Sequence, residues 1–384
     1  MYTPVLNANE KARELVDIVR QQTDAPINVC IETVSVMLGA LLTDLPAEQG
    51  LRSIRNALAQ DEIVDVDNCY DAHLLQALIT ELTDNIEDKE QQSWTIRDDE
   101  QILVDALNQF SSILKNADRR VCLKHLRQSD FCFVQRLVAL YQIDQRGNVS
   151  LAVLKALQRC CELDTGIVSL LLCSNLPVIL IINNTFSAPL SELQTASIEM
   201  LCALFSTTEK PPFTHYDYFT VEFLGKILSL LDDSSRLIMR FLLNFNAHFD
   251  HNESLVVETL RRNHSLAFGQ LLIDELNRLR NANDLNAMKM VFDVFTAEPE
   301  IISTTFYDND LRVLGDVLCQ DLLDTDIREK ITMILEVLER MSCPNGHGDK
   351  RQIGDSLQTL LLSKEISDDH KQRAESILRL CQSE

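Results

Sequence analysis

The chain has 384 residues with only 10 glycines, 9 prolines and 6% aromatic residues. Because Leu, Ile, Asp, Glu and Ala dominate the rest, the composition predicts an all-α protein and argues against a β-rich fold. The formal net charge of −23 argues against nucleic acid or an anionic membrane as the principal partner, since both are bound by clustered Lys and Arg.

The hydrophobic fraction of 46% is sufficient to bury a continuous core, which excludes a disordered acidic protein. At this length either several domains or an extended repeat array is expected, and the shortage of turn residues favours the array. The eleven cysteines are an odd number and lie mostly within apolar helical runs. They are therefore interpreted as small core residues in a reducing compartment.

The first half of the chain shows apolar residues at helical spacing, separated by short polar breaks. Ser191 is a candidate N-cap for the last helix of this half. An acidic loop that contains the only tryptophan, Trp94, is predicted at 84–100, within a wider acidic segment at 61–100. The predicted helices cover residues 27–42, 51–58, 74–82, 102–114, 121–126, 131–141, 149–161, two short runs within 166–182, and 191–205.

The apolar run at 166–182 is interrupted by Ser174, Asn175 and Pro177 and is shorter than ~20 residues. It is interpreted as a pair of buried helices, and no signal sequence opens the chain. We therefore expect a cytoplasmic protein without membrane insertion.

Pro211 and Pro212 cannot continue a helix, so residues 206–217 are predicted to form an extended link between two halves. Helix pairs or triplets recur about every 40 residues, a period typical of armadillo and HEAT-like arrays. We predict one armadillo-like helical superhelix over residues 1–384, with any subdivision at the link; two compact bundles joined there are the alternative. Beyond the link, helices are predicted near 218–231, 235–247, 253–262, 265–280, 285–295, 309–323, 327–341, 350–363 and 367–381.

No combination of residues indicates catalysis or metal binding. The pair of histidines in 248–251 lacks a third ligand, and Cys343 and His347 lack a second pair at zinc-site spacing. The acidic run at 61–71 fails as a calcium loop because Tyr70 stands where the sharp turn needs glycine. Phosphate-binding glycine loops and nucleophile motifs are absent from the sequence. We expect a non-enzyme without cofactor or metal.

Residues 289–323 are the most informative segment. A helical pattern stops, Phe306 and Tyr307 form an aromatic corner, and a second apolar helix follows at once. Pro299 suits the first turn of a short helix before the corner. After the corner, Asp308, Asn309 or Asp310 is a candidate N-cap. One buried stripe is predicted from the spacing of Leu311, Leu314, Val317, Leu318 and Leu322.

The motifs VFDVF at 291–295, FYDNDLRVLGDVL at 306–318 and FLLNFNAHFD at 241–250 resemble the leucine-rich, armadillo-like domain of the WISH/DIP/SPIN family. The resemblance extends over about residues 235–340. It implies a protein of the actin cytoskeleton and cell cortex, connected with endocytosis, that binds and activates the actin-related protein 2/3 complex. Such activators need no preformed filament, and they nucleate linear actin filaments that seed branched networks.

The resemblance also leaves alternatives. The vertebrate member carries an SH3 domain and proline-rich segments, which this sequence lacks, so it more nearly matches the short fungal form. Recruitment by SH3-containing or cortical adaptor proteins therefore stays open, and actin is expected to be an indirect partner. The alternative function is a non-catalytic scaffold that gathers peptides or proteins in its groove.

Several residues are candidates for contact with a partner. Four of them are arginines, at positions 261, 262, 278 and 280. They lie at helix C-terminal ends, where they complement the helix dipole or meet an acidic patch on a partner. For the aromatic pair we favour sealing of a junction between helical layers. Asn244 and Asn246 interrupt an apolar helix and are expected to brace the backbone of the next repeat; the alternative is that they face the groove and meet a partner. The partner-binding candidates are Arg261, Arg262, Arg278, Arg280, Phe306, Tyr307 and Asp310.

Overall fold

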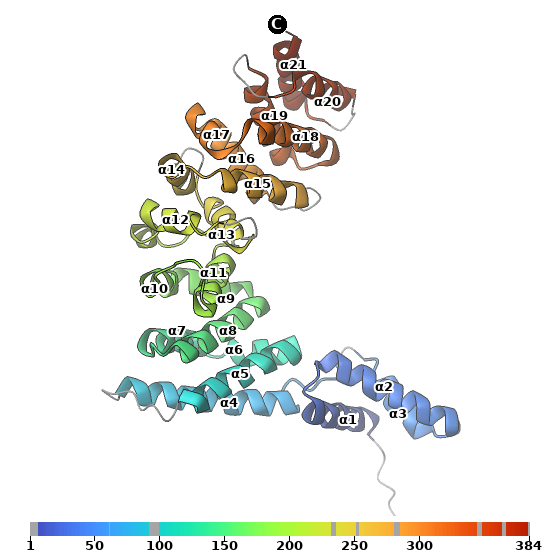
Figure 1. The fold of residues 1–384 in the computed structure, drawn as a ribbon. Helices are drawn as coiled ribbons and strands as arrows, with labels where there is room; N and C mark the ends of the chain where they lie inside the picture. Colours follow the sequence, from blue (N-terminus) through green and yellow to red (C-terminus); the bar gives the residue numbers. More distant parts are fainter. Residues whose placement is uncertain are drawn as a thin grey trace, which may run out of the picture. The chain divides into compact units, whose positions relative to one another are not determined.

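The structure, a computed structural model, describes residues 7–60, 62–91, 100–231, 236–250, 253–279, 285–343, 348–362 and 366–382. Across these ranges the secondary structure is helical, with twenty-one α-helices and no strand (Figure 1). The prediction of an all-α fold is thereby confirmed. The chain divides into two compact units, Met1–Leu171 and Leu172–Glu384.

The first unit begins with three helices that pack around one small core, which contains Val16, Val34 and Ile54. In the rest of the unit α5 packs on α4 and α8, and α7 packs on α8. The helices of this unit are α1 Ala8–Thr23, α2 Ile27–Asp44, α3 Gln49–Ala57, α4 Tyr70–Gln91, α5 Glu100–Asn116, α6 Arg119–Leu126, α7 Cys132–Ile143 and α8 Gly147–Leu163.

The acidic loop predicted at 84–100 is shorter than expected, because α4 continues to Gln91 and α5 begins at Glu100. Leu82 and Ile86 are both fully buried and stand four residues apart, so the apolar stripe of α4 runs on through the acidic residues. Residues 92–99, including Trp94, lie outside the described residues.

The division between the units falls within α9 Thr165–Cys173, whereas the predicted link at 206–217 lies inside the second unit. Phe205 and Phe219, on either side of the link, both pack on Phe245 with ring centroids 5.0 Å apart. This aromatic cluster holds the two ends of the link together. The predicted subdivision at 206–217 therefore does not coincide with the observed one.

The second unit consists of stacked rows of helices. One row contains α12, α14 and α17, a second contains α15, α18 and α20, and a third contains α11, α13, α16, α19 and α21, each helix contacting the next in its row. The elements are α10 Leu176–Ile182, α11 Glu192–Leu204, the 3₁₀ helix η2 Phe213–Asp217, α12 Val221–Leu228, α13 Arg236–Asn246, α14 Leu255–Arg262, α15 Leu266–Arg278, α16 Asn286–Thr296, α17 Pro299–Thr305, α18 Asp308–Asp324, α19 Arg328–Ser342, α20 Lys350–Leu362 and α21 Asp368–Gln382.

Two complete triplets are present in these rows, α14–α15–α16 and α17–α18–α19, each a short helix followed by two longer ones. Because every triplet covers its apolar faces with the next triplet, the arrangement is that of an armadillo-type repeat. The prediction of stacked helical repeats is confirmed within this unit.

Helix α2 is the one single helix among the described residues that is long and apolar enough to cross a membrane. Helices α9 and α10 pass the same test together but are bent by 60° at Ser174–Asn175. Ile167, Leu171 and Leu180 are fully buried, as expected for the predicted pair of core helices.

Candidate partner-binding surface

Helix α14 carries two of the predicted contact residues on its solvent face. Its N-cap Ser254 accepts a hydrogen bond from the Val257 N–H at 3.1 Å. Leu260 faces the core and is fully buried. Thr259 is also buried, whereas the last two positions of the helix face outward. Arg261 and Arg262 therefore lie about half exposed at the C-terminal end of the helix, where the helix dipole favours positive charge.

The two arginines share one carboxylate. The Nε atoms of Arg261 and Arg262 each donate to an oxygen of Glu258, both at 2.8 Å. The hydrogen bond from Arg261 is the largest cause of a lowered pKa for the Glu258 carboxyl group, and Arg262 adds to it. Because the pair is bound to Glu258, it presents a mixed-charge surface rather than free positive charge.

Longer ion pairs connect α14 with both neighbours in its row. Arg262 lies 3.9 Å from Glu222 of α12, and Arg261 lies 4.0 Å from Glu298, which precedes α17. At these distances and exposures the pairs stabilise little, on the order of 0–1 kcal/mol each. An arginine can therefore leave such a carboxylate for a partner at small energetic cost.

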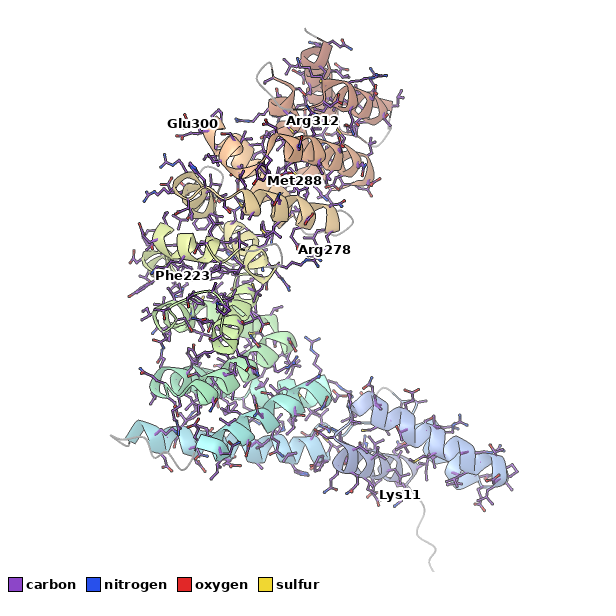
Figure 2. The ribbon with its side chains drawn as sticks, viewed as in Figure 1. Lys11, Phe223, Arg278, Met288, Glu300 and Arg312 are labelled. Atoms are coloured by element: carbon purple, nitrogen blue, oxygen red, sulfur yellow. The ribbon has the colours of Figure 1, made fainter. Side chains whose placement is uncertain are left out.

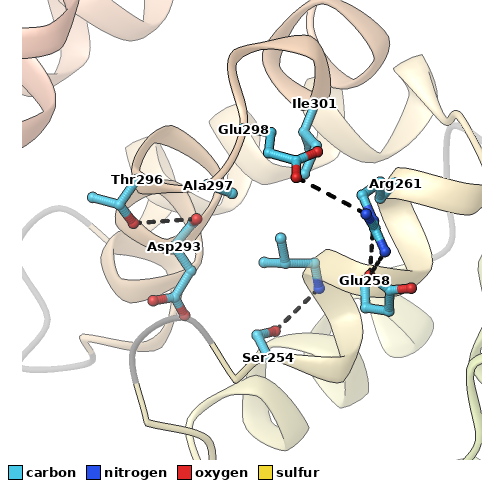
Figure 3. A pocket seen from close by; sticks show the side chains of 9 residues that line it. Ser254, Glu258, Arg261, Asp293, Thr296, Ala297, Glu298 and Ile301 are labelled. Atoms are coloured by element: carbon cyan, nitrogen blue, oxygen red, sulfur yellow. Dashed lines mark hydrogen bonds and ion pairs between the residues drawn. The ribbon is translucent and has the colours of Figure 1, made fainter.

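A groove of about 520 Å³ opens beside Arg261 (Figure 3). Its rim carries the Arg261–Glu298 and Arg261–Glu258 ion pairs, and its walls come from α14, α16 and α17. Val257, Ala297 and Ile301 supply its apolar part, and the carboxylates outnumber the single arginine. The lining residues are Ser254, Val257, Glu258, Arg261, Asp293, Thr296, Ala297, Glu298 and Ile301.

A second groove, of about 460 Å³, lies on the other side of the same helix. It is formed with α12 and includes Glu222, Lys226 and Arg262. The two arginines thus separate two neighbouring grooves along one row of helices. We call the exposed face of α12, α14 and α17, with both grooves, the α14 surface.

Buried polar residues fix the helices beneath this surface. The Asn246 side-chain amide of α13 donates to Asp293 of α16 at 2.7 Å, and Ser254 donates to the Asn246 side-chain oxygen. Lys289 donates to the same carboxylate of Asp293. Because a buried amide or carboxylate without partners is costly, these bonds set the register between neighbouring repeats.

Asn244 continues this bracing along the third row. Its side-chain amide donates to the carbonyl of Cys202 on α11 at 3.0 Å, and its oxygen accepts from the Asn286 amide on α16 at 3.1 Å. Asn244 and Asn246 therefore brace neighbouring helices, as expected, but the one backbone bond goes to the preceding helix α11, and the bonds to α16 are made with side chains.

The aromatic corner divides its two members between core and solvent. Phe306 is 2% exposed and packs on Phe295 with ring centroids 6.0 Å apart, whereas Tyr307 is 48% exposed. Helix α18 begins at Asp308, with Tyr307 at the N-cap position and no side-chain cap bond, so the predicted N-cap at Asp308, Asn309 or Asp310 is wrong. Asp308 and Asp310 lie instead in the first turn, where the helix dipole favours negative charge.

The remaining candidates lie elsewhere in the second unit. Asp310 lines a separate groove of about 410 Å³ between α15 and α18. Arg278, labelled in Figure 2, donates through Nε to Glu275 at 3.0 Å near the C-terminal end of α15. Arg280 lies outside the described residues. The predicted residues therefore do not form a single site.

Metal-binding chemistry finds no support among the described residues, where no three His, Cys, Asp or Glu side chains converge on one point. His248 is buried, and its Nε2 lies 3.0 Å from the carbonyl oxygen of Phe205. Burial lowers the pKa of His248, so the imidazole is stabilised in its neutral form. This histidine closes the aromatic cluster around Phe205.

Sequence reasoning missed the groove residues outside the two arginines, above all Glu298 and Ile301. Pro299 indicates where these residues lie, because it begins α17, the short helix that extends the row of α12 and α14. The sequence predicted this short helix but not its neighbours in space.

Residues 231–345 match the family model described as SPIN90/Ldb17, leucine-rich domain. The match includes helices α13 to α19, and with them Arg261, Arg262, and the aromatic corner. It confirms the resemblance seen in the sequence for this part of the chain, and it indicates a role in actin-related or endocytic processes.

Proposed function

We propose that this chain, which carries the SPIN90/Ldb17 leucine-rich domain, binds and activates the actin-related protein 2/3 complex without a preformed filament. The product is a linear actin filament that seeds later branching, and actin itself is an indirect partner. The observation that carries the proposal is the family match over residues 231–345, which contains two complete helix triplets and the helix that carries the arginine pair.

The proposed contact region is the α14 surface. A protein of net charge −23 is attracted to a basic protein surface, and the groove at Arg261 offers Glu258 and Glu298 to such a partner. Arg261 and Arg262 then bind carboxylates on the partner, since their present ion pairs are exposed and weak. A surface of alternating sign specifies one orientation of docking better than uniform charge does.

The mechanism is a shift in population. A surface that binds the active arrangement of the complex more tightly than the inactive one stabilises the active arrangement by the difference in binding free energy. Such selection requires a surface that does not deform. The buried bonds of Asn244 and Asn246 supply this stiffness by fixing α13 to its neighbours in the third row.

The chain acts in this proposal as a non-enzymatic activator at the cytoplasmic cell cortex, and it needs no cofactor. Its recruitment there would depend on SH3-containing or other cortical adaptor proteins. The location at the cortex, the absence of a cofactor and the route of recruitment all follow from the proposed activity.

The test is polymerisation of pyrene-labelled actin with the purified full chain and the actin-related protein 2/3 complex. Preformed filaments and acidic verprolin-homology activators are omitted. We expect faster polymerisation than with the complex alone, and unbranched filaments by fluorescence microscopy. Binding to the complex without acceleration would favour the scaffold alternative, and the absence of both binding and acceleration would reject the proposal.

A further inference from the structure

Helix α2 combines an apolar sequence with little burial. Its inward face, formed by Cys30, Val34 and Leu38, completes the core of α1 to α3. The outward face carries exposed apolar side chains beside the exposed Glu32 and Thr43: Val36 is 66% exposed, and Met37, on the flank of this face, is 56% exposed. Its other exposed apolar residues are Val29, Ala40 and Leu41, with Leu45 immediately after the helix.

Three of these residues form a stripe along the helix, whereas Met37 and Leu41 lie about 100° and 140° further round from Val36. Val29, Val36 and Ala40 are separated by seven and four residues, so they point in nearly the same direction. Clustered exposure of this kind is unusual for a monomeric protein surface and marks an interaction site. Burial of such a face contributes roughly 25 cal/mol for each Å² removed from water.

Charge distribution argues against a lipid surface as the occupant. Helices that lie on membranes carry Lys and Arg beside the apolar face, whereas α2 contains no basic residue and two acidic ones, Glu32 and Asp44. The whole chain carries a charge of −23, which is repelled by anionic headgroups.

A second copy of the same helix fits the charges. Glu32 and Gly39 stand seven residues apart and so lie on the same flank of the stripe. Because Gly39 has no side chain, Arg55 of α3 lies over it, with Cζ 3.5 Å from the position that a β-carbon would occupy. This flank therefore carries one exposed acidic and one exposed basic group, Glu32 and Arg55.

An antiparallel pair would bring these charges together. With a two-fold axis at Val36, Glu32 lies four residues before the axis and Gly39 three residues after it. In such a pair each flank faces its own copy in reverse order, so Glu32 comes opposite Gly39 of the second copy with an axial offset of only about 1.5 Å. Arg55 covers that glycine, and two equivalent Glu32–Arg55 ion pairs result.

We propose that the outward face of α2 is a homodimer interface, in which two copies pack antiparallel about Val36 and exchange Glu32–Arg55 ion pairs. An 18-residue helix is about 27 Å long, so the contact is at the small end of specific interfaces. We expect a dissociation constant in the micromolar range. The dimer would place two copies of the α14 surface in one particle.

The experiment is sedimentation velocity of the full chain from about 1 to 100 µM, the range that brackets the expected affinity. The wild-type chain is expected to pass from monomer to dimer. Val36→Glu places a charge in the centre of the stripe and should weaken dimerisation at least about tenfold. Val313→Glu, at a position 49% exposed on α18, is the matched control and should leave it unchanged.

A charge exchange tests the register. E32R and R55E should each weaken the dimer because like charges then face each other, and the double variant E32R/R55E should restore it. Far-ultraviolet circular dichroism and thermal unfolding check that each variant is folded. A chain that stays monomeric to 100 µM, a dimer insensitive to V36E, or a double variant that is no better than the single ones would overturn the proposal. Sedimentation of a monomer with lipid vesicles, abolished by V36E, would overturn it in favour of a membrane surface.

Discussion

Gly269 of α15 lies against Phe306 at the corner between α17 and α18. A β-carbon on Gly269 would stand 2.9 Å from Cδ1 of Phe306 and 2.0 Å from the carbonyl oxygen of Thr305. Both distances are shorter than the van der Waals contact of a β-carbon, so only glycine allows α15 to lie this close to the corner between α17 and α18. The pair joins one triplet of helices to the next.

The substitution Gly269→Ala is therefore expected to destabilise the protein. The added methyl group meets backbone as well as a buried ring, and overpacking of this kind costs about 1–3 kcal/mol. Urea unfolding followed by circular dichroism measures the change. Gly354→Ala on α20 is the control, because its β-carbon would meet only Leu378 at 3.9 Å and the substitution should be neutral or stabilising. Equal effects of the two substitutions would contradict the proposed close packing.

The two residues of the aromatic corner should respond differently to truncation. Phe306→Ala removes a buried ring and is expected to lower the free energy of unfolding by about 3–5 kcal/mol. Tyr307→Ala, at a half-exposed position, should change it by about 0.5 kcal/mol or less. Denaturant titration of both variants compares these effects. A severe loss of actin-nucleating activity in a stable Tyr307→Ala protein would show that this residue contacts a partner after all.

Charge reversal of the arginine pair tests the α14 surface. We expect Arg261→Glu combined with Arg262→Glu to lower the rate of complex-dependent actin nucleation at least about tenfold, since each lost charged contact is worth about 1–3 kcal/mol. The thermal midpoint should fall only slightly, because exposed pairs at helical spacing stabilise by only about 0.3–0.5 kcal/mol, and the like-charge contacts with Glu258 that replace them cost similar amounts.

The matched control for this prediction is Arg159→Glu in the first unit. Arg159 pairs with Glu162 three residues later at 2.7 Å, as Arg261 pairs with Glu258, but it lies far outside the matched family domain. Its reversal should leave nucleation unchanged. If the Arg261 and Arg262 variant unfolds several degrees lower than wild type, the pair is structural.

The buried bond between Asn246 and Asp293 should be visible as energetic coupling. Asn246→Ala leaves the Asp293 carboxylate with one donor fewer in a buried site, which costs about 1–3 kcal/mol. A double-mutant cycle with Asp293→Ala is expected to give a coupling free energy of about 0.5–3 kcal/mol. Additive effects of the two substitutions would mean that the bond does not connect the repeats.

Acidification should destabilise the protein through His248. Burial holds the pKa of this imidazole below its ordinary value of 6.5, so the unfolded chain binds a proton more readily than the folded one. The unfolding free energy therefore falls as the pH drops below about 6.5, by at most about 1.4 kcal/mol per pH unit for one histidine, until the folded-state pKa is reached.

Urea unfolding at pH 7.5 and pH 5.5 measures this dependence. His248→Gln retains a hydrogen-bond donor for the Phe205 carbonyl but cannot titrate, so its unfolding free energy should change less between the two pH values. A pH dependence identical to that of the wild-type chain would show that His248 is not responsible.

Local patterns in the sequence were sufficient for most of the fold. Ser191 was correctly predicted as a helix cap, and it forms a reciprocal capping box with Gln194. The stripe from Leu311 to Leu322 is buried as its spacing indicates. The acidic residues of 84–100 indicate a loop, but Leu82 and Ile86 continue the buried stripe of α4, so the helix extends further than the local charge predicts.

The candidate surface was predicted only in part. The sequence identified Arg261 and Arg262 as a local concentration of positive charge, but Glu222 and Glu298 lie about forty residues away on either side along the chain. Their proximity follows from the stacking of α12, α14 and α17. Charges on separate helices meet only when the packing distance and rotation of those helices are set.

The sequence by itself determined the all-α class, the repeat period and the family resemblance, because each depends on residues near one another in the chain. Hydrophobic periodicity indicates which face of a helix is buried. The tertiary structure decided which neighbour covers that face, and it left the outward face of α2 uncovered. It also placed Gly269 against Phe306, a contact that depends on the separation of two helix backbones and has no signature in the spacing of residues.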